Sequence, residues 1–251
     1  MNASSPFPTS MKTKAPSSFT RAFSLVELLV VISVIAIIAG FAVPAVTTMI
    51  KGSQLSQGSQ MVTDQLSLAR TMALGRNRSV EIRFYKFGDP ETPGEQVRNP
   101  ETGYFRALQI FEILDNGALL PAGPIQRLPS NVIMNEGGLS TLLDKIERKP
   151  VTTPSSSDPE MPDTEVGRKY YYTSFRFLPD GSTDLPPNGT LSATKKRPIG
   201  DSWYITVHGQ NVRKGSGETD GSTTILPDNY FTLQIDPVTG STRSYRPTLL
   251  H

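Results

Sequence analysis

Few side chains in this chain could carry out chemistry. Cysteine is absent and only two histidines occur, His208 and the terminal His251. Thiol nucleophiles and thiolate metal sites are therefore excluded, and Ser-His-Asp catalysis has little to use. His208 lies in the stretch WYITVHG without an acid–base partner nearby, and we interpret it as a structural strand residue. We expect a protein that is not an enzyme and that holds no cofactor.

Two carboxylates flank a turn in the stretch LPDGSTD. Asp180 and Asp184 could offer oxygen ligands to Ca²⁺. Asp-Gly is also a very common turn dipeptide, and the spacing differs from that of an EF-hand loop. We expect an ordinary turn and no metal, with these two aspartates as the candidate ligands. For the tyrosines at 170–172 we expect a strand with one packed face rather than a binding patch.

The charge of the chain is concentrated near its start. The formal net charge is +2, and residues 1–22 contain Lys12, Lys14 and Arg21 but no acidic residue, which leaves −1 for the remainder. A chain without a basic excess beyond its first residues is not expected to bind nucleic acid.

The most unusual carboxylate is Glu27, near the start of the apolar stretch RAFSLVELLVVISVIAIIAGFAVPAV. About 19 uncharged residues follow from Leu28 to Val46, close to the length that spans a hydrocarbon core. The basic residues before it favour a cytoplasmic N-terminus. A plain single-pass anchor and a secretory signal peptide, with a small-residue site near AGFAVPA, are two interpretations. Neither explains a carboxylate at a position where it is costly.

The same residues resemble the N-terminal signature of type IV prepilins and type II secretion pseudopilins. That signature is a short basic leader, a small residue, Phe-Ser/Thr-Leu-x-Glu and an apolar run. Here it reads Ala22, Phe23, Ser24, Leu25, Val26, Glu27 and Leu28. Most members of the family have glycine where this chain has alanine.

The resemblance implies a processing step and an assembly contact. Prepilin peptidase would cleave between Ala22 and Phe23, after a leader that starts at Met1 or Met11, and would N-methylate Phe23. Glu27 would pair with the new N-terminal amine of a neighbouring subunit, which would satisfy a charge at membrane depth. A further position, Pro44, falls where many pilins kink their first helix.

A helical pattern continues beyond the apolar run. Apolar residues recur at intervals of seven, four, three and four, at Leu55, Val62, Leu66, Ala69 and Ala73. Gly75 and Asn77 suit the end of the helix. We therefore predict one long helix, with residues 23–46 as its transmembrane or filament-core half and residues 47–76 as its amphipathic half.

Strand patterns separated by turns follow in residues 77–251. The predicted strand segments are 79–87, 104–114, 125–135, 169–182, 201–209 and 229–245. The polar, proline-rich stretch near residues 149–167 is predicted to be an exposed, disordered loop. The fold class is therefore α+β and pilin-like, with the helix packed on an antiparallel β-rich domain.

A narrower resemblance involves later parts of the chain. The stretch LSLARTMALGRNRSVEIRF, with LPSNVIM, FRFLPDGS and DPVTGSTR further on, resembles the H-type minor pseudopilins of type II secretion. The chain is also similar to the group named Verru_Chthon cassette protein D. The resemblance implies a structural subunit of a type II secretion or type IV pilus-like filament, with residues 1–22 as a cleaved cytoplasmic leader.

The implied partners are prepilin peptidase, other pilin or pseudopilin subunits, an inner-membrane assembly platform, and membrane lipid before assembly. The implied location is a single pass through a bacterial inner membrane, with residues 77–251 in the periplasm, followed by the filament. The alternative is a membrane-anchored binding or adhesion protein that does not polymerise.

Overall fold

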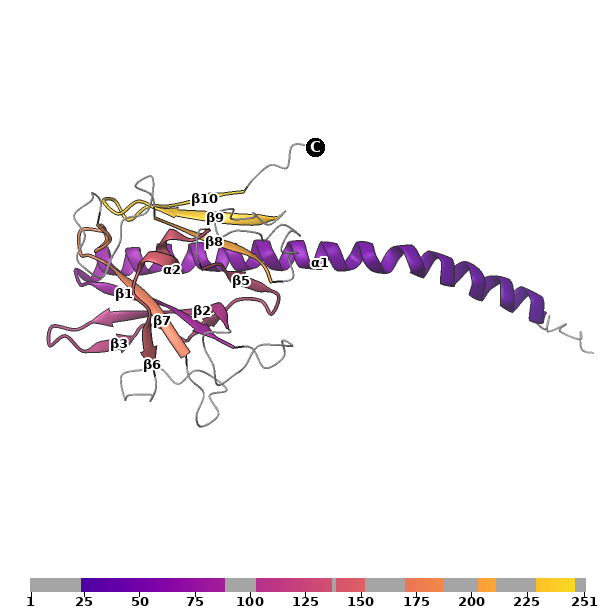
Figure 1. Cartoon of the computed structure of the whole chain (residues 1–251), viewed down its shortest axis with the longest axis horizontal. Helices are drawn as coiled ribbons and strands as arrows, with labels where there is room; N and C mark the ends of the chain where they lie inside the picture. The colour runs from indigo at the N-terminus through magenta and orange to yellow at the C-terminus, as the bar shows by residue number, and fades with distance from the viewer. Residues whose placement is uncertain are drawn as a thin grey trace, which may run out of the picture. The chain divides into compact units, whose positions relative to one another are not determined.

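The structure is a computed structural model that describes residues 24–88, 103–136, 139–151, 170–186, 203–210 and 229–246. The chain divides into two compact units, residues 1–47 and 48–251. The described elements, labelled in Figure 1, are α1 (Leu25–Arg76), β1 (Val80–Phe87), β2 (Tyr104–Ile113), β3 (Leu119–Pro121), β4 (Gln126–Arg127), β5 (Val132–Met134), α2 (Thr141–Lys145), β6 (Lys149–Val151), β7 (Tyr170–Phe177), β8 (Trp203–Gly209), β9 (Tyr230–Ile235) and β10 (Thr242–Tyr245).

The first unit contains the apolar half of α1. Every side chain from residue 24 to residue 40 is exposed, including large apolar ones such as Leu25, which is 79% exposed. The hydroxyl of Ser33 donates a hydrogen bond to the carbonyl oxygen of Leu29, 2.8 Å away, so this polar group is satisfied within the helix. The helix assignment is unbroken through Pro44.

The amphipathic half of α1 supplies one wall of the core of the second unit. All five residues of the predicted stripe are buried, at 0 to 3% exposure: Leu55, Val62, Leu66, Ala69 and Ala73. The helix ends at Arg76, and Asn77 follows with a φ of 50°. Asparagine tolerates this left-handed conformation better than most residues. The predicted stripe and the predicted helix end are thus confirmed.

The strands that the structure describes in the second unit form one antiparallel sheet of ten. Its main path runs β10-β9-β8-β5-β2-β1-β7-β6, and β3 and β4 also pair with β2. The short strand β5 joins two parts of the sheet, because it pairs with β8 through three residues and with β2 through Phe105 and Met134 alone. The predicted α+β architecture, a long N-terminal helix followed by an antiparallel sheet domain, is confirmed.

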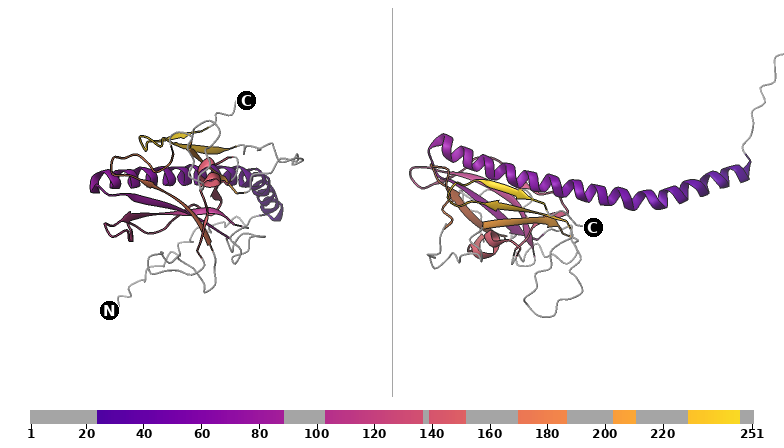
Figure 2. Two further views of the ribbon diagram at one scale, coloured as in Figure 1. Left: turned by 60° about the vertical axis from the view of Figure 1, so that its left-hand side comes forward. Right: turned by 90° about the horizontal axis from the view of Figure 1, so that it is seen from above.

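The sheet curls around the second half of α1. Strands β8, β9 and β10 lie along one side of this helix segment, and β1, β2 and β7 lie along the other (Figures 1 and 2). The helix stripe and the facing strand residues form one core, in which Trp203, Phe84, Phe175 and Leu233 are buried. A smaller cluster on the opposite face of the sheet contains Tyr85, Phe87, Ala107 and Tyr170.

The helix α2 packs beside β8, where β8 extends beyond β5. Side chains at the start of this helix accept the backbone hydrogen bonds that a neighbouring strand would otherwise accept. The hydroxyl of Ser140 accepts a hydrogen bond from the backbone N–H of Thr206 at 2.8 Å, and the hydroxyl of Thr141 accepts one from the N–H of Tyr204 at 3.0 Å. Buried backbone donors need such partners, so these two hydroxyls allow the sheet to open here.

Some elements differ from the sequence-based predictions. The segment 125–135 divides into β4, a loop and β5, and 229–245 divides into β9 and β10. Strands β3 and β6 and helix α2 were not predicted. The first residues of the predicted disordered loop, Lys149–Val151, form β6, and residues 152–169 lie outside the described residues.

Strand β1 is buried on both faces, although its sequence alternates apolar and charged residues. The charged side chains of this strand can be buried because they form ion pairs. Glu81 and Arg83 are 3% and 4% exposed, and the guanidinium Nε of Arg83 lies 2.7 Å from a carboxylate oxygen of Glu81. The alternation in sequence therefore distinguishes the two faces of the strand, but it does not indicate whether either face is exposed to solvent.

Candidate functional site

The structure describes only part of the N-terminal motif. Ala22 and Phe23, the predicted cleavage and methylation residues, lie outside the described residues. Glu27 lies in the first turn of α1, where a carboxylate interacts favourably with the helix dipole. Its side chain is exposed, and its neighbours Val26 and Leu28 are 66% and 57% exposed. The only acidic side chain of this turn is thus surrounded by apolar groups that have no partner within the described chain.

Within the residues that the structure describes, no helix is long and apolar enough to cross a membrane. The span predicted for residues 23–46 includes Phe23 and the side chains of residues 41–45, which are not described.

Asp180 stabilises the turn in which it lies. One of its carboxylate oxygens accepts hydrogen bonds from the backbone N–H and the hydroxyl of Ser182, at 2.9 and 2.6 Å. These bonds hold the pKa of Asp180 below its usual range. Asp184 accepts a hydrogen bond from the backbone N–H of Arg176 at 2.9 Å. Among the described residues, no group of three or more histidine or acidic side chains could hold a metal ion.

A second turn, between β9 and β10, docks beside the turn of Asp180. Asp236 accepts hydrogen bonds from the backbone N–H groups of Val238 and Thr239, and these bonds hold the pKa of its carboxyl below the usual range. Arg70 of α1 holds both turns, because its Nε donates to the carbonyl oxygen of Thr239 at 2.9 Å and to that of Gly181 at 3.3 Å. Sequence reasoning missed this role of Arg70.

His208 is 7% exposed and bridges neighbouring backbone and side-chain groups. Its Nδ1 lies 2.8 Å from the carbonyl oxygen of Gly209, and its Nε2 lies 2.9 Å from the amide nitrogen of Asn135. A neutral ring that donates through Nδ1 and accepts through Nε2 satisfies both contacts. Burial lowers the pKa of His208, against a raising contribution from the bond to Gly209.

We expect His208 to make the folded protein sensitive to acid. Because its folded pKa is depressed, its contribution to stability is complete above the ordinary value of 6.5 and is lost as the pH falls through the folded pKa. The slope is at most about 1.4 kcal/mol per pH unit. Urea unfolding of wild type and His208→Gln between pH 7.5 and 5 measures it. A wild-type curve parallel to that of the variant would contradict the expectation.

The three consecutive tyrosines of β7 lie on a strand, as expected. Tyr170 is 2% exposed, and Tyr171 and Tyr172 are partly buried. The ring of Tyr85 contacts those of Tyr170 and Tyr172, with centroids 5.7 and 6.3 Å apart. Tyr170 and Tyr172 thus contribute to the second core cluster.

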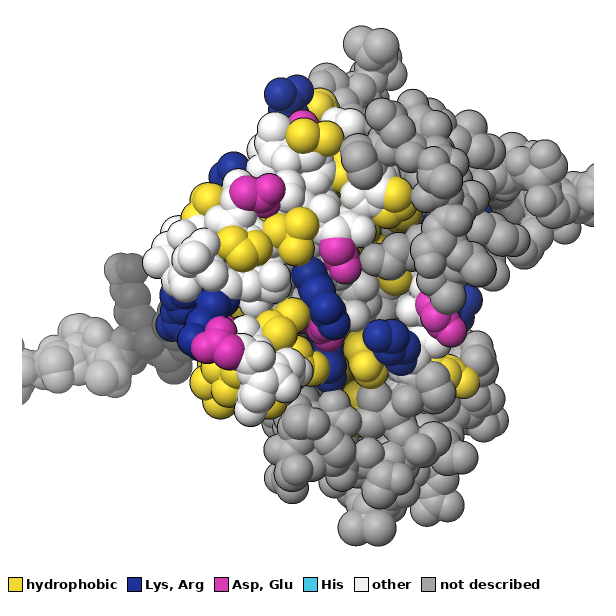
Figure 3. Space-filling view, turned by 90° about the vertical axis from the view of Figure 1, so that its left-hand side faces the viewer, with side chains coloured by type: hydrophobic (Ala, Val, Ile, Leu, Met, Phe, Trp, Pro, Cys, Tyr) yellow, Lys and Arg dark blue, Asp and Glu magenta, His cyan; other side chains and the backbone are white. Residues whose placement is uncertain are grey.

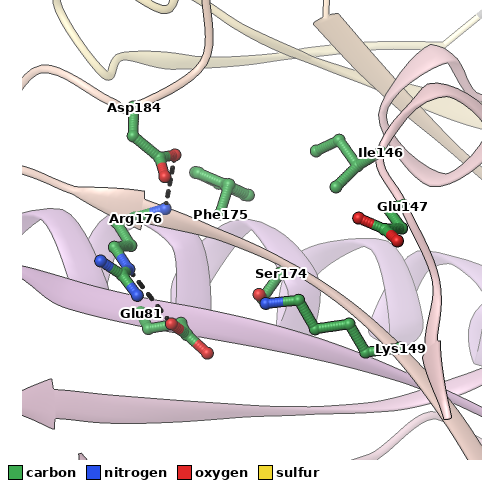
Figure 4. Close-up of a pocket in the computed structure, with 8 residues that line it drawn as sticks. All are labelled: Glu81, Ile146, Glu147, Lys149, Ser174, Phe175, Arg176 and Asp184. Atoms are coloured by element: carbon green, nitrogen blue, oxygen red, sulfur yellow. Dashed lines mark hydrogen bonds and ion pairs between the residues drawn. The ribbon is translucent and has the colours of Figure 1, made fainter. Parts of the chain in front are cut away.

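A small pocket of about 160 Å³ lies beside β7, and it was not predicted from the sequence (Figure 4). Arg176 is central to it. Its Nε donates to Glu81 at 3.2 Å, and its backbone N–H donates to Asp184. Glu147 and Lys149, from the segment that follows α2, line the opposite side.

The charges around this pocket are mixed. Two cationic side chains and three carboxylates line it, and among these Glu81 is already bound by Arg83 and Arg176. The face of the molecule drawn in Figure 3 likewise shows Lys, Arg, Asp and Glu side chains interspersed with apolar ones. Such a surface selects neither an anion nor a cation.

Together, the described elements define an α+β protein in which one long helix precedes and packs on an antiparallel sheet. Residues 18–43 match the family model of the prokaryotic N-terminal methylation motif. The chain therefore carries a prepilin-type N-terminal motif, and the resemblance drawn from Ala22–Leu28 is confirmed. The chain matches no curated protein sequence.

Solved structures give a distant likeness. The minor pseudopilin EpsH from the type 2 secretion system of Vibrio cholerae is 10% identical, with a TM-score of 0.36, over 77% of this chain and 98% of that one. The type IV minor pilin FimU of Pseudomonas aeruginosa is 12% identical, with a TM-score of 0.35, over 78% of this chain and 90% of that one. At these values the likeness carries no functional argument.

Proposed function

We propose that this chain is a structural subunit of a type II secretion or type IV pilus-like filament, of the minor pseudopilin kind. Prepilin peptidase would cut between Ala22 and Phe23 and methylate the amine of Phe23. The apolar half of α1 would lie in the inner membrane before assembly and among neighbouring subunits afterwards. The role is mechanical rather than catalytic, and the sheet domain would lie in the periplasm.

The observation that carries this proposal is the coincidence of the methylation motif with an exposed apolar helix surface. The motif covers residues 18–43, and the described side chains of α1 in that range are exposed. An apolar surface of this extent needs lipid or other protein to cover it. The internal hydrogen bond of Ser33 suits either surrounding, because neither supplies water.

The mature N-terminus tests the processing step. Mass spectrometry of the protein from membranes of a cell that contains prepilin peptidase should find N-methyl-Phe23 as the first residue. An intact leader would favour a plain anchor, and a start after residue 40 would favour a secreted protein. Either result would overturn the proposal.

Replacing Glu27 with glutamine tests the assembly step. The variant should still be cleaved and inserted, because the change removes a charge that is costly in the membrane. It should lose at least about 90% of its incorporation into filaments, because the amine of the neighbouring subunit would lack its carboxylate partner. Quantitative immunoblotting of sheared filaments measures the loss, and Asp64→Asn, on the exposed face of the amphipathic half, is the control. Normal incorporation of the glutamine variant would favour an anchored protein that does not polymerise.

A further inference from the structure

The main path of the sheet ends in two edge strands that differ in chemistry. One edge is β6, whose central residue, Pro150, has no backbone N–H to offer to a further strand. The other edge is β10, which has no proline from Thr242 to Tyr245. Proline is a common means of blocking unwanted strand pairing, so of these two edges β10 is the one left open.

The backbone of β10 presents unpaired groups along this edge. Arg243 lies opposite Gln234 of β9, and Tyr245 lies opposite Thr232. The backbone N–H of Asp236 donates to the carbonyl oxygen of Ser241 at 3.0 Å, at the start of this ladder. Because hydrogen bonding alternates along an antiparallel pair, residues 243 and 245 face β9, and residues 242 and 244 point their N–H and C=O groups away. No described residue pairs with those outward groups.

The side chains of β10 add positive charge to this edge. Arg243 is exposed, and its charge contributes to the lowered pKa of the Asp236 carboxyl in the adjoining turn. Tyr245 is 48% exposed. Arg246, just beyond the strand, lies over the ring of Phe231 at 5.1 Å, and its only described hydrogen bond is a long one of 3.4 Å to Asn229. The strand itself contains no carboxylate.

These positive charges favour some binding partners of the β10 edge over others. Pairing of β10 with the same strand of a second copy would bring arginines together across the new ladder, and like charges in that position are destabilising. A segment with carboxylates at alternate positions would instead place one of them opposite Arg243. Its backbone would complete the hydrogen bonds of Thr242 and Ser244.

We propose that β10 is a strand-addition site for an extended, acidic peptide segment of a partner protein. This is the mode of recognition in which backbone bonds supply affinity and alternate side chains supply specificity. Thr242 and Ser244 provide the backbone contacts, Arg243 selects for carboxylates on its face of the ladder, and Arg246 adds positive charge at the end of the strand. The proposal goes beyond a structural role in a filament and does not depend on it.

Peptide binding to the full chain in detergent micelles tests this site. The probes are two fluorescein-labelled hexapeptides, one alternating threonine with glutamate and one alternating threonine with lysine. The glutamate peptide should bind at least about tenfold more tightly by fluorescence anisotropy, and it should slow amide hydrogen exchange in residues 242–246. Equal affinity for the two peptides, or protection elsewhere in the chain, would overturn the proposal.

Two kinds of variant separate backbone pairing from charge attraction. Ser244→Pro removes an outward N–H that β9 does not use, so it should weaken binding about tenfold, whereas Ser244→Ala should bind as wild type does. The double change Arg243→Glu and Arg246→Glu should reverse the preference toward the lysine peptide. If Ser244→Pro fails to fold, the double arginine variant alone tests the site. A double variant that still prefers the glutamate peptide would reject the proposal.

Discussion

Replacing Gly240 with alanine is expected to destabilise the second unit by about 3 kcal/mol. Gly240 has a φ of 65°, and a Cβ placed there would lie 2.1 Å from the backbone oxygen of Gly181. Neither turn can move without losing the bonds that Arg70 makes to both. Urea unfolding followed by the fluorescence of Trp203, the single tryptophan and a buried one, measures the change.

Gly117 provides a matched control for this prediction. Its φ is 80°, but a Cβ there would meet no atom within 4 Å. Gly117→Ala should therefore cost only the backbone strain, about 1 kcal/mol. Equal losses for the two variants would mean that the close approach of Gly240 to Gly181 adds nothing to stability.

Replacing Glu81 with alanine is expected to cost about 3–5 kcal/mol, because it leaves the buried cation of Arg83 without its carboxylate. The guanidinium of Arg83 lies between two aromatic rings, 4.6 Å from the centroid of Phe111 and 4.4 Å from that of Tyr172. Burial alone would lower the pKa of Arg83, but the hydrogen bond and charge of Glu81 outweigh it and raise that pKa. The side chain thus stays charged, with its guanidinium between the two rings.

Two further variants show whether the loss comes from removing the carboxylate of Glu81 beside the charge of Arg83. Glu147→Ala removes an exposed carboxylate from the same pocket and should change stability by less than about 0.5 kcal/mol. The double change Glu81→Leu and Arg83→Met removes both charges and should recover most of the stability lost in Glu81→Ala. A double variant as unstable as Glu81→Ala would mean that shape, not charge, accounts for the loss.

Local patterns in the sequence were enough to predict α1 and most strands. The spacing of Leu55, Val62 and Leu66 specifies which face of the helix is buried, because apolar residues that repeat with a period near 3.6 fall on one face of an α-helix. Asn77 marks the helix end through its tolerance of positive φ. Glu27 stood out because a lone carboxylate in an apolar run has few explanations.

Features that depend on distant parts of the chain could not be predicted in this way. Alternation in β1 shows two faces, but the burial of both depends on what later segments bring against them. The placement of β5 between β2 and β8 rests on a few residue pairs between segments far apart in sequence. The role of Arg70 could not be predicted because its acceptors, the backbone oxygens of two late turns, carry no sequence signal.

The contact between Arg70 and Thr239 joins residues 169 positions apart. A contact of such sequence separation forms only after a large loss of chain entropy, which slows folding. Because synthesis runs from the N-terminus, the helix that carries Arg70 is made long before the turn at Thr239 that it contacts. A chain interrupted before residue 236 would contain the whole of α1 and most of the sheet, yet it would lack the turn whose carbonyl Arg70 binds.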